Sequence, residues 1–260
     1  MPVRDPGNGR RSTVTSVVLP VLGVTASVGL WWLAMIVFGI ESYLAPTPPE
    51  VVAAFGRLPG YLLTNAGVTF LETVQGFAIT TGIGLIVGGV LAGSRTLEQA
   101  FMPTLVALNA VPKLAFAPLL VVWMGFGQGP KVVMVVLLCF FPIVLSVATG
   151  LTRTPADLAE LARSLCASRW QEFIRVRLPA ALPQIFVGLK VAMPLAVIGA
   201  LVGELSGATE GLGFVIQNAG ADTATAFAAI VLLALMSVAL FYALVVAERL
   251  LLPWVRETTG

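Results

Sequence analysis

The chain contains no histidine, and its only cysteines are Cys139 and Cys166. The lack of histidine excludes a His-dependent catalytic triad and a histidine-ligated metal site. Two distant cysteines form neither a disulfide framework nor a zinc site. The stretch 125–131 (GFGQGPK) resembles a P-loop but lacks its spacing and its hydroxyl residue, so the chain has no ATP-binding P-loop of its own. We therefore expect this chain to bind no cofactor and no metal.

Charge is also scarce, because only 11% of the 260 residues are charged while 58% are hydrophobic. A soluble domain is roughly 25% charged. Too few charges are present to cover a soluble globule of this length. The net charge is only +2 and no basic block occurs, which argues against a nucleic-acid partner. The composition predicts an integral membrane protein whose surroundings are membrane lipid.

Long apolar stretches are what the sequence has in abundance. A membrane-spanning helix needs about 20 apolar residues. Six stretches qualify: 16–40, 73–93, 102–124, 132–152, 181–203 and 226–247. The first exceeds the roughly 7–15 residues of a signal-peptide core, so we expect it to be a retained helix. The expected fold class is an all-α integral membrane protein with six transmembrane helices.

Lysine and arginine are distributed unevenly between the connecting segments, and this bias sets the orientation. With the N-terminus inside, only Arg57 and Lys131 lie on the outer side. The cytoplasmic segments would hold Arg4, Arg10, Arg11, Arg95, Arg153, Arg163, Arg169, Arg175, Arg177, Arg249 and Arg256. Both termini are therefore predicted to be cytoplasmic.

This topology divides the chain into an N-terminal tail (1–15), a transmembrane domain (16–247) and a C-terminal tail (248–260). Residues 41–72 and 204–225 are expected outside. Residues 153–180 form the longest polar stretch on the cytoplasmic side.

The cytoplasmic stretch 153–180 has the pattern of two short helices. Thr154, Pro155 and Asp157 suit the start of the first, and Ser168 with Gln171 forms a capping box for a second that ends at Leu178–Pro179. Its apolar face has nothing to bury against in the cytosol. It is either a simple connector or a hairpin that docks into a groove of a soluble partner.

The same stretch resembles the E-A-A-x3-G-x9-I-x-L-P loop of bacterial binding-protein-dependent ABC importer permeases. Glu160, Ala162, Val176, Leu178 and Pro179 match it in register, whereas Leu161 replaces an alanine and Cys166 replaces the glycine. Five further segments are similar to the nitrate/taurine/sulfonate branch of these permeases: APTPPEVVAAF, PKLAFAPLLVVWMGFG, FFPIVLS, ASRWQEFIRVRLPAALPQIFVGLK and GLGFVIQNA.

This resemblance implies a type I ABC importer permease with a cytoplasmic coupling hairpin, in the bacterial inner (plasma) membrane. Two permease copies, as a homodimer, would form the path for a small anionic or organic solute such as nitrate, a sulfonate or taurine; a pyrimidine-type vitamin precursor or another small nutrient is the alternative. A periplasmic or lipid-anchored binding protein would deliver the solute. A dimer of ATPase subunits would bind and hydrolyse ATP, so this chain is not itself an enzyme.

The resemblance also assigns residues that would couple transport to the ATPase. They are Glu160, Leu161, Ala162, Arg163, Cys166, Ser168, Arg169, Val176, Leu178 and Pro179.

Lys113 is an ionisable residue inside a predicted span, next to Pro112, which interrupts the helix. Asn109 lies four residues earlier and shares its helical face. The pair either lines the substrate pathway, where it could attract an anion, or Lys113 contacts a backbone carbonyl or snorkels. Snorkelling is also expected for Lys190, near the cytoplasmic end of its span. Small residues spaced four apart, which permit close helix packing, occur in the second span: Gly84, Gly88, Gly89 and Gly93.

Three other classes of membrane protein fit the sequence less well. A secondary transporter would need internally repeated halves, and no repeat is evident. An ion channel would need a selectivity-filter run or an acidic ring. An intramembrane enzyme would need histidine or a pair of intramembrane acids, and the predicted spans contain neither.

Overall fold

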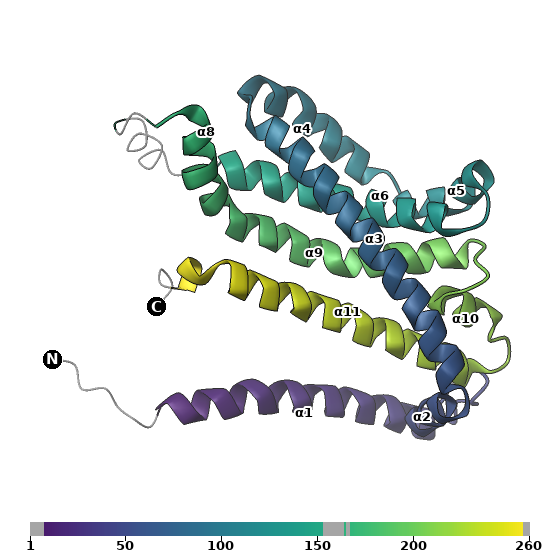
Figure 1. The fold of residues 1–260 in the computed structure, drawn as a ribbon. Coiled ribbons are helices and arrows are strands. Elements are labelled where there is room, and N and C mark those ends of the chain that lie inside the picture. The colour runs from purple at the N-terminus through teal and green to yellow at the C-terminus, as the bar shows by residue number, and fades with distance from the viewer. Residues whose placement is uncertain (1–7, 153–163, 165–166, 257–260) are drawn as a thin grey trace. The chain divides into compact units, whose positions relative to one another are not determined.

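The computed structural model describes residues 8–152, 164 and 167–256, and within them every regular element is helical. The elements run in the order α1 (Asn8–Val37), α2 (Pro48–Arg57), α3 (Pro59–Ala92), α4 (Arg95–Ala110), η1 (Lys113–Phe116), α5 (Ala117–Met124), α6 (Gln128–Thr152), α8 (Arg169–Glu172), η2 (Phe173–Arg177), α9 (Leu178–Leu205), α10 (Leu212–Asn218), α11 (Thr223–Leu251) and η3 (Pro253–Arg256) (Figure 1). The predicted all-α fold is confirmed.

The described chain divides into two compact units. The first contains the residues up to Pro59 together with Ala219–Ala228. Within it, α2 begins at a capping box, because Glu50 accepts a hydrogen bond from the Thr47 amide over 2.7 Å. Trp31 stacks on Phe227 with 5.9 Å between the ring centroids. The ring contact joins α1 to the first turns of α11.

The second unit contains Gly60–Asn218 and Ala229–Gly260, and its core lies between α6 and α9. Both helices are rich in β-branched and small residues, and they pack along their length. A methyl group at Gly199 of α9 would lie 2.8 Å from Val135 Cα of α6, so the two backbones approach closely there. Small residues permit this spacing between membrane helices.

Helix α3 packs on α6 through two of the glycines that the sequence marks as small residues spaced four apart. A methyl group at Gly84 would lie 2.5 Å from Ile143 Cγ2, and one at Gly88 would lie 2.6 Å from Val147 Cβ. A methyl group at Gly89, by contrast, would have nothing within 4 Å. Gly84 and Gly88 therefore make a helix contact within one subunit.

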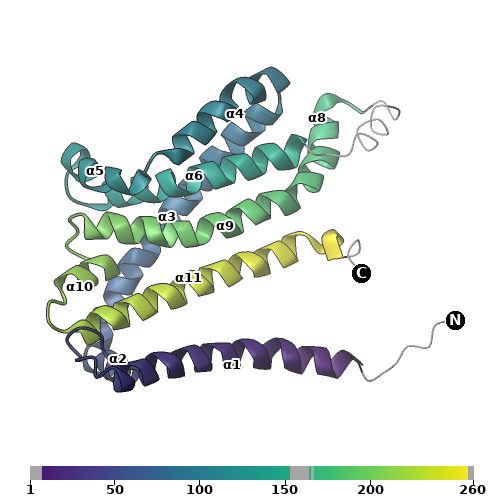
Figure 2. The ribbon, with the colours of Figure 1, turned by 180° about the vertical axis from the view of Figure 1, so that it is seen from behind.

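The two ends of the second unit are formed by different helices (Figures 1 and 2). The start of α4, the helix α8 and the C-terminal end of α11 lie at one end, whereas α5 and α10 lie at the other. The predicted topology assigns the first group to the cytoplasmic side and the second to the outer side. The arrangement agrees with that grouping of segments.

The number of spans differs from the predicted six. Four helices are long and apolar enough to cross a membrane: Pro59–Ala92, Gln128–Thr152, Trp170–Leu205 and Thr223–Leu251. Arg95–Ala110 and Lys113–Met124 together make a fifth, bent by 72°. In α1, the apolar helix Val21–Val37 is shorter than these. The six-span count is therefore not confirmed among the described residues.

Several boundaries also differ from the prediction, and two of them bear on the site. Helix α3 begins at Pro59, far before residue 73, because Glu72 is buried inside the fold instead of marking the water boundary. The second helix of the cytoplasmic stretch does not end at Leu178–Pro179. It continues through a π-helical turn, η2, directly into α9.

Candidate functional site

The cytoplasmic stretch is described from its second helix onward. Ser168 and Gln171 make both hydrogen bonds of the predicted capping box: Gln171 Oε1 accepts from the Ser168 amide over 2.9 Å, and Ser168 Oγ accepts from the Gln171 amide over 3.3 Å. Arg169 is the first residue of α8. The predicted coupling residues Glu160, Leu161, Ala162, Arg163 and Cys166 lie outside the described residues.

The remaining predicted coupling residues lie where α8 joins α9. Val176 belongs to the π-helical turn, and Leu178 and Pro179 form the first turn of α9. All three are half-buried, and Leu178 packs with Phe173 against the core between α6 and α9. This junction therefore connects α8 to the core between α6 and α9.

Asn109 and Lys113 come together at the break in the third predicted span. Asn109 lies in the last turn of α4 and Lys113 opens η1, just after the bend at Pro112. Lys113 Nζ donates a hydrogen bond to Asn109 Oδ1 over 2.6 Å. Proline lacks the backbone N–H that continues an α-helix, so backbone groups are released at this point.

A pocket of about 480 Å³ opens beside this pair. Asn109 and Lys113 supply its polar groups. Its other walls are apolar, mostly aliphatic, with Phe116, Phe140 and Phe141 among them. A second hollow of about 350 Å³ shares Asn109 and Lys113. One cation and one amide thus lie in an otherwise apolar cavity, an arrangement able to hold an anionic or polar group on an apolar body.

A buried polar cluster that sequence reasoning missed lies nearer the other end of α3. Lys131 Nζ of α6 donates to Glu72 Oε1 of α3 over 2.6 Å. Glu204 of α9 accepts from Thr69 Oγ1 and from the Gly213 amide, each over 2.6 Å. Glu72 and Glu204 are fully buried. The two acids lie just outside the predicted spans, and α3 and α9 extend past the predicted bounds at residues 73 and 203 to include them.

The cluster also fixes α10 against α3. The Gly211 amide donates to Asn65 Oδ1 over 2.7 Å, and the Leu212 amide donates to Thr69 Oγ1 over 2.8 Å. With the bond from Gly213 to Glu204, three backbone donors at the start of α10 find side-chain acceptors. A signal is present in the sequence, because polar residues recur on one face of α3 at positions 65, 69, 72, 73 and 80.

Lys190, for which the sequence predicts snorkelling, forms an ion pair with Glu248. Its ammonium lies 2.8 Å from Glu248 Oε2 and 3.0 Å from Oε1, and both side chains are 22% exposed. The pair joins α9 to α11. Ionisable residues in or near a membrane commonly pair with one another in this way. The sequence alone shows Glu248 only as a charge that follows the last span.

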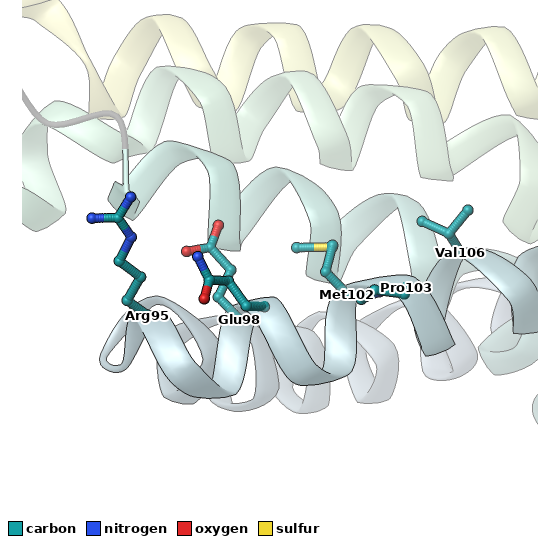
Figure 3. Close-up of a pocket in the computed structure, with 6 residues that line it drawn as sticks. Arg95, Glu98, Met102, Pro103 and Val106 are labelled. Atoms are coloured by element: carbon teal, nitrogen blue, oxygen red, sulfur yellow. The ribbon is translucent and has the colours of Figure 1, made fainter.

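A further pocket, of about 670 Å³, lies along α4. Figure 3 shows Arg95 and Glu98 at the start of the helix and Met102, Pro103 and Val106 farther along it. Polar groups thus give way to apolar ones in the direction away from the predicted cytoplasmic boundary. This gradient is expected where a helix enters a bilayer.

Comparisons with known proteins agree with this architecture. Residues 80–257 match the family described as binding-protein-dependent transport system inner membrane component. The chain is 35% identical over 228 residues to the formylaminopyrimidine transport permease protein ThiX of Halalkalibacterium halodurans, covering 86% of this chain and 91% of ThiX. It is 29% identical over 247 residues to the taurine transport system permease protein TauC of Escherichia coli, covering 89% and 90%.

A chain of the MetNI methionine ABC transporter in an inward-facing conformation has the same fold, with a TM-score of 0.61, 22% identity and coverage of 74% of this chain and 95% of that one. Permeases of this kind work with ATPase subunits and substrate-binding proteins, and ATP hydrolysis belongs to the ATPase subunit. The chain belongs to the binding-protein-dependent transport system inner membrane components, the permease subunits of ABC importers.

Proposed function

We propose that the chain pairs with a second copy of itself to form the path by which a small anionic or organic solute enters a bacterial cell. In this assembly a dimer of ABC ATPase subunits binds the cytoplasmic stretch 153–180, and a periplasmic or lipid-anchored protein delivers the solute. The chain lies in the inner membrane with both termini in the cytoplasm. Membership of the permease family and the grouping of segments at the two ends of the second unit support this assignment.

The observation that carries the substrate class is the Lys113–Asn109 pair in its apolar pocket. A lysine inside a span is costly unless it faces a partner or a cavity. An incoming anion would offset that cost, while Phe116 and the neighbouring apolar walls would contact the rest of the solute. A sulfonate such as taurine meets this requirement. A pyrimidine-type precursor is the second candidate, since the relative named for formylaminopyrimidine transport is 35% identical and the phenylalanines of the pocket can contact a planar ring.

Capture of the intact complex from native membranes separates these candidates. We expect the tagged permease to retain an ATPase subunit and a binding protein, whose ligand then identifies the solute. Purification of a functional transporter without any ATPase would instead indicate a secondary transporter.

Uptake by the reconstituted complex tests the pathway role of Lys113. We expect Lys113→Ala to reduce uptake while basal ATP hydrolysis persists, and Lys113→Arg to retain more uptake because the positive charge remains. Arg249→Ala is the matched control, since it removes an exposed positive charge at the end of α11. Unchanged uptake kinetics in Lys113→Ala would exclude Lys113 from the pathway.

Docking of the ATPase is tested by Ala162→Asp. A carboxylate on the apolar face of the hairpin would have to be buried unpaired against the partner, at a cost of several kcal/mol. The permease should reach the membrane but lose its ATPase subunit during purification. Ala180→Asp, on an exposed position in the first turn of α9, is the control that should retain it.

Cysteine labelling in intact cells tests the orientation. The native residues are first changed by Cys139→Ser and Cys166→Ser. A membrane-impermeant reagent should then label Pro48→Cys and not Arg169→Cys. The reverse pattern would overturn the proposed topology.

A further inference from the structure

The junction between the coupling hairpin and the membrane core is a π-helical turn, η2, formed by Phe173–Arg177. Its defining hydrogen bond runs from the Leu178 amide to the Phe173 carbonyl, five residues back. The helix is otherwise continuous from Trp170 to Leu205. Such single π turns inside α-helices are rare and occur frequently at functional sites.

An ion pair spans the π turn. The Arg177 guanidinium donates to Glu172 Oε1 through Nε over 2.9 Å and through Nη2 over 2.7 Å. The Glu172 side chain is only 8% exposed, and that of Arg177 is 36% exposed. This is a two-donor, partly buried contact of the strong kind.

The spacing of the pair fits the π turn and does not fit an α-helix. At about 100° per residue, side chains five apart on an α-helix point about 140° away from each other. Only residues three or four apart are neighbours there. In a turn closed by a five-residue hydrogen bond, residues five apart lie one above the other. The Glu172–Arg177 pair therefore stabilises the π register specifically.

Pro179 favours the same register. In an uninterrupted α-helix its amide would bond to the Arg175 carbonyl, but proline has no N–H and its ring clashes with that carbonyl. The wider turn just before it relieves the conflict. Phe173 and Leu178, at either end of the turn, pack against the core between α6 and α9 and hold the turn in place.

The register determines how the hairpin is presented. Converting the π turn to α-helix would shift every residue before it by one position, which is a rotation of about 100° and a translation of about 1.5 Å relative to α9. The hairpin face that meets the ATPase would then point elsewhere. The helix can transmit motion from the ATPase in a fixed direction only if its register stays unchanged during that motion.

We propose that Glu172 and Arg177 are positioning residues for coupling: their ion pair locks the helix joint in π register and so fixes the direction in which the hairpin meets the ATPase. The proposal rests on the proposed function of residues 153–180. It adds Glu172 and Arg177, which the family motif does not include, to the residues on which coupling depends.

The central experiment uses the complete complex and moves the arginine by one position. The double variant Val176→Arg, Arg177→Val keeps the composition but offers Glu172 a partner at four-residue spacing, which favours an α-helical register. We expect stimulation of ATP hydrolysis by the loaded binding protein to fall roughly tenfold, within the usual range of coupling factors. Arg175→Val is the matched control, because Arg175 is exposed in the same turn and should leave stimulation unchanged.

A charge swap separates positioning from a merely structural role. Glu172→Arg alone places like charges together and should abolish stimulation, whereas Glu172→Arg with Arg177→Glu restores the pair at the same spacing and should recover most of it. If the moved-arginine variant does not reach the membrane, Glu172→Gln with Arg177→Gln removes the charges at similar side-chain size and should lose stimulation by itself. Full stimulation in either double variant that lacks the five-residue pair would overturn the proposal, as would failure of the charge swap to recover stimulation.

Cross-linking distinguishes failure of this proposal from failure of the proposed function. Ser168→Cys, at the start of α8, should cross-link to the ATPase subunit in the otherwise unmodified complex. Absence of any cross-link would indicate that the hairpin does not contact the ATPase, and would contradict both the proposed docking role and the register proposal. A cross-link together with full stimulation in the moved-arginine variant would leave the docking role intact and reject only the register lock.

Discussion

Lys131 and Glu72 form an ion pair 2.6 Å long inside the fold, with side chains that are 7% and 0% exposed. One residue of the pair lies on α6 and the other on α3, so the bond ties two spans together. Glu72 has no exposed side-chain surface and Lys131 has little, so water screens this pair only weakly. Removing one partner would leave the other buried and unpaired, which costs far more than the net contribution of the pair.

We therefore predict that Lys131→Met destabilises the permease by about 3–5 kcal/mol. The double variant Glu72→Met, Lys131→Met should recover most of that loss, because two apolar side chains of similar length can pack together without a desolvation cost. Thermal unfolding of the purified protein in detergent, arranged as a double-mutant cycle, measures the difference. Equal stability of Lys131→Met and the unmodified protein would contradict the assignment of a buried pair.

Alanine substitution should change the stability of the permease in opposite directions at two adjacent glycines of α3. A methyl group at Gly88 would lie 2.6 Å from Val147 Cβ and 3.0 Å from the Val144 carbonyl oxygen, so Gly88→Ala must push α3 away from α6, at a cost of about 1–3 kcal/mol. A methyl group at Gly89 has nothing within 4 Å, and Gly89→Ala should gain up to about 1 kcal/mol in helix propensity.

The comparison needs only the thermal midpoints of the two variants. A lower thermal midpoint in Gly88→Ala, with no lower midpoint in Gly89→Ala, would identify the glycine face of α3 as a contact within the subunit. Equal losses would indicate that Gly89 also packs closely, against a second copy of the chain.

The apolar spans are predictable from sequence because their signal is local and long. Runs such as Gln128–Thr152 and Thr223–Leu251 are apolar over most of their length, so a window of about 20 residues finds them. The bend at Pro112 is predictable for the same reason, since proline acts on its own helix. The Ser168–Gln171 capping box is equally local, and both of its hydrogen bonds are present.

The buried cluster is not predictable in the same way because its bonds join distant segments. In the sequence, Lys131 and Glu72 look like charges that mark the outer boundary, and nothing near either residue indicates that they meet. Only the polar stripe of α3, with Asn65 and Thr69 among its members, indicates that this face lies away from lipid. Pairings between helices depend on the fold, so a single sequence leaves them undetermined.

The π turn could not be predicted from the sequence for a different reason. Leu178–Pro179 looks like a helix end, because proline cannot continue an α-helix. A register change before the proline removes that conflict and lets the helix continue as α9. The five-residue spacing of Glu172 and Arg177 is visible in the sequence, but it indicates an ion pair only if a π turn is expected.

Asp222 should make the start of α11 sensitive to acid. The hydrogen bond from Thr225 Oγ1, 2.7 Å long, is the main cause that holds the pKa of Asp222 below its usual value of 3.8, and the Thr225 amide and Arg57 lower it further. A depressed folded-state pKa contributes stability that is present above pH 3.8 and is lost as the pH falls through the lower folded value.

The protection of the amides in the first turn of α11 against hydrogen exchange, relative to their intrinsic exchange rates, should therefore fall as the solution is acidified below pH 3.8. Asp222→Asn keeps a side-chain acceptor but has no carboxylate to titrate, so its exchange should be faster at neutral pH and should lack this acid-dependent step. An identical acid step in Asp222→Asn would assign the titration to another group.

Glu204 should determine whether α10 stays attached to the membrane core. Its carboxylate accepts the Gly213 amide and the Thr69 hydroxyl, and it lies so close to Gly211 that a methyl group there would collide with it. Gly211 also has φ +109°, a conformation that other residues rarely adopt, so Gly211→Ala should be strained as well as crowded.

Replacing the acid by alanine leaves the Gly213 amide buried without an acceptor, which costs about 1–3 kcal/mol. Glu204→Gln should be intermediate, because its amide oxygen can accept one of the two hydrogen bonds while its NH₂ group cannot accept the other. Glu210→Ala is the control, since Glu210 is an exposed acid in the same loop. Hydrogen exchange at Leu212–Asn218 should accelerate in the order Glu210→Ala, Glu204→Gln, Glu204→Ala. If Glu204→Ala protects these amides as well as the control does, the cluster does not anchor α10, and the three amides at its start must be held by other contacts.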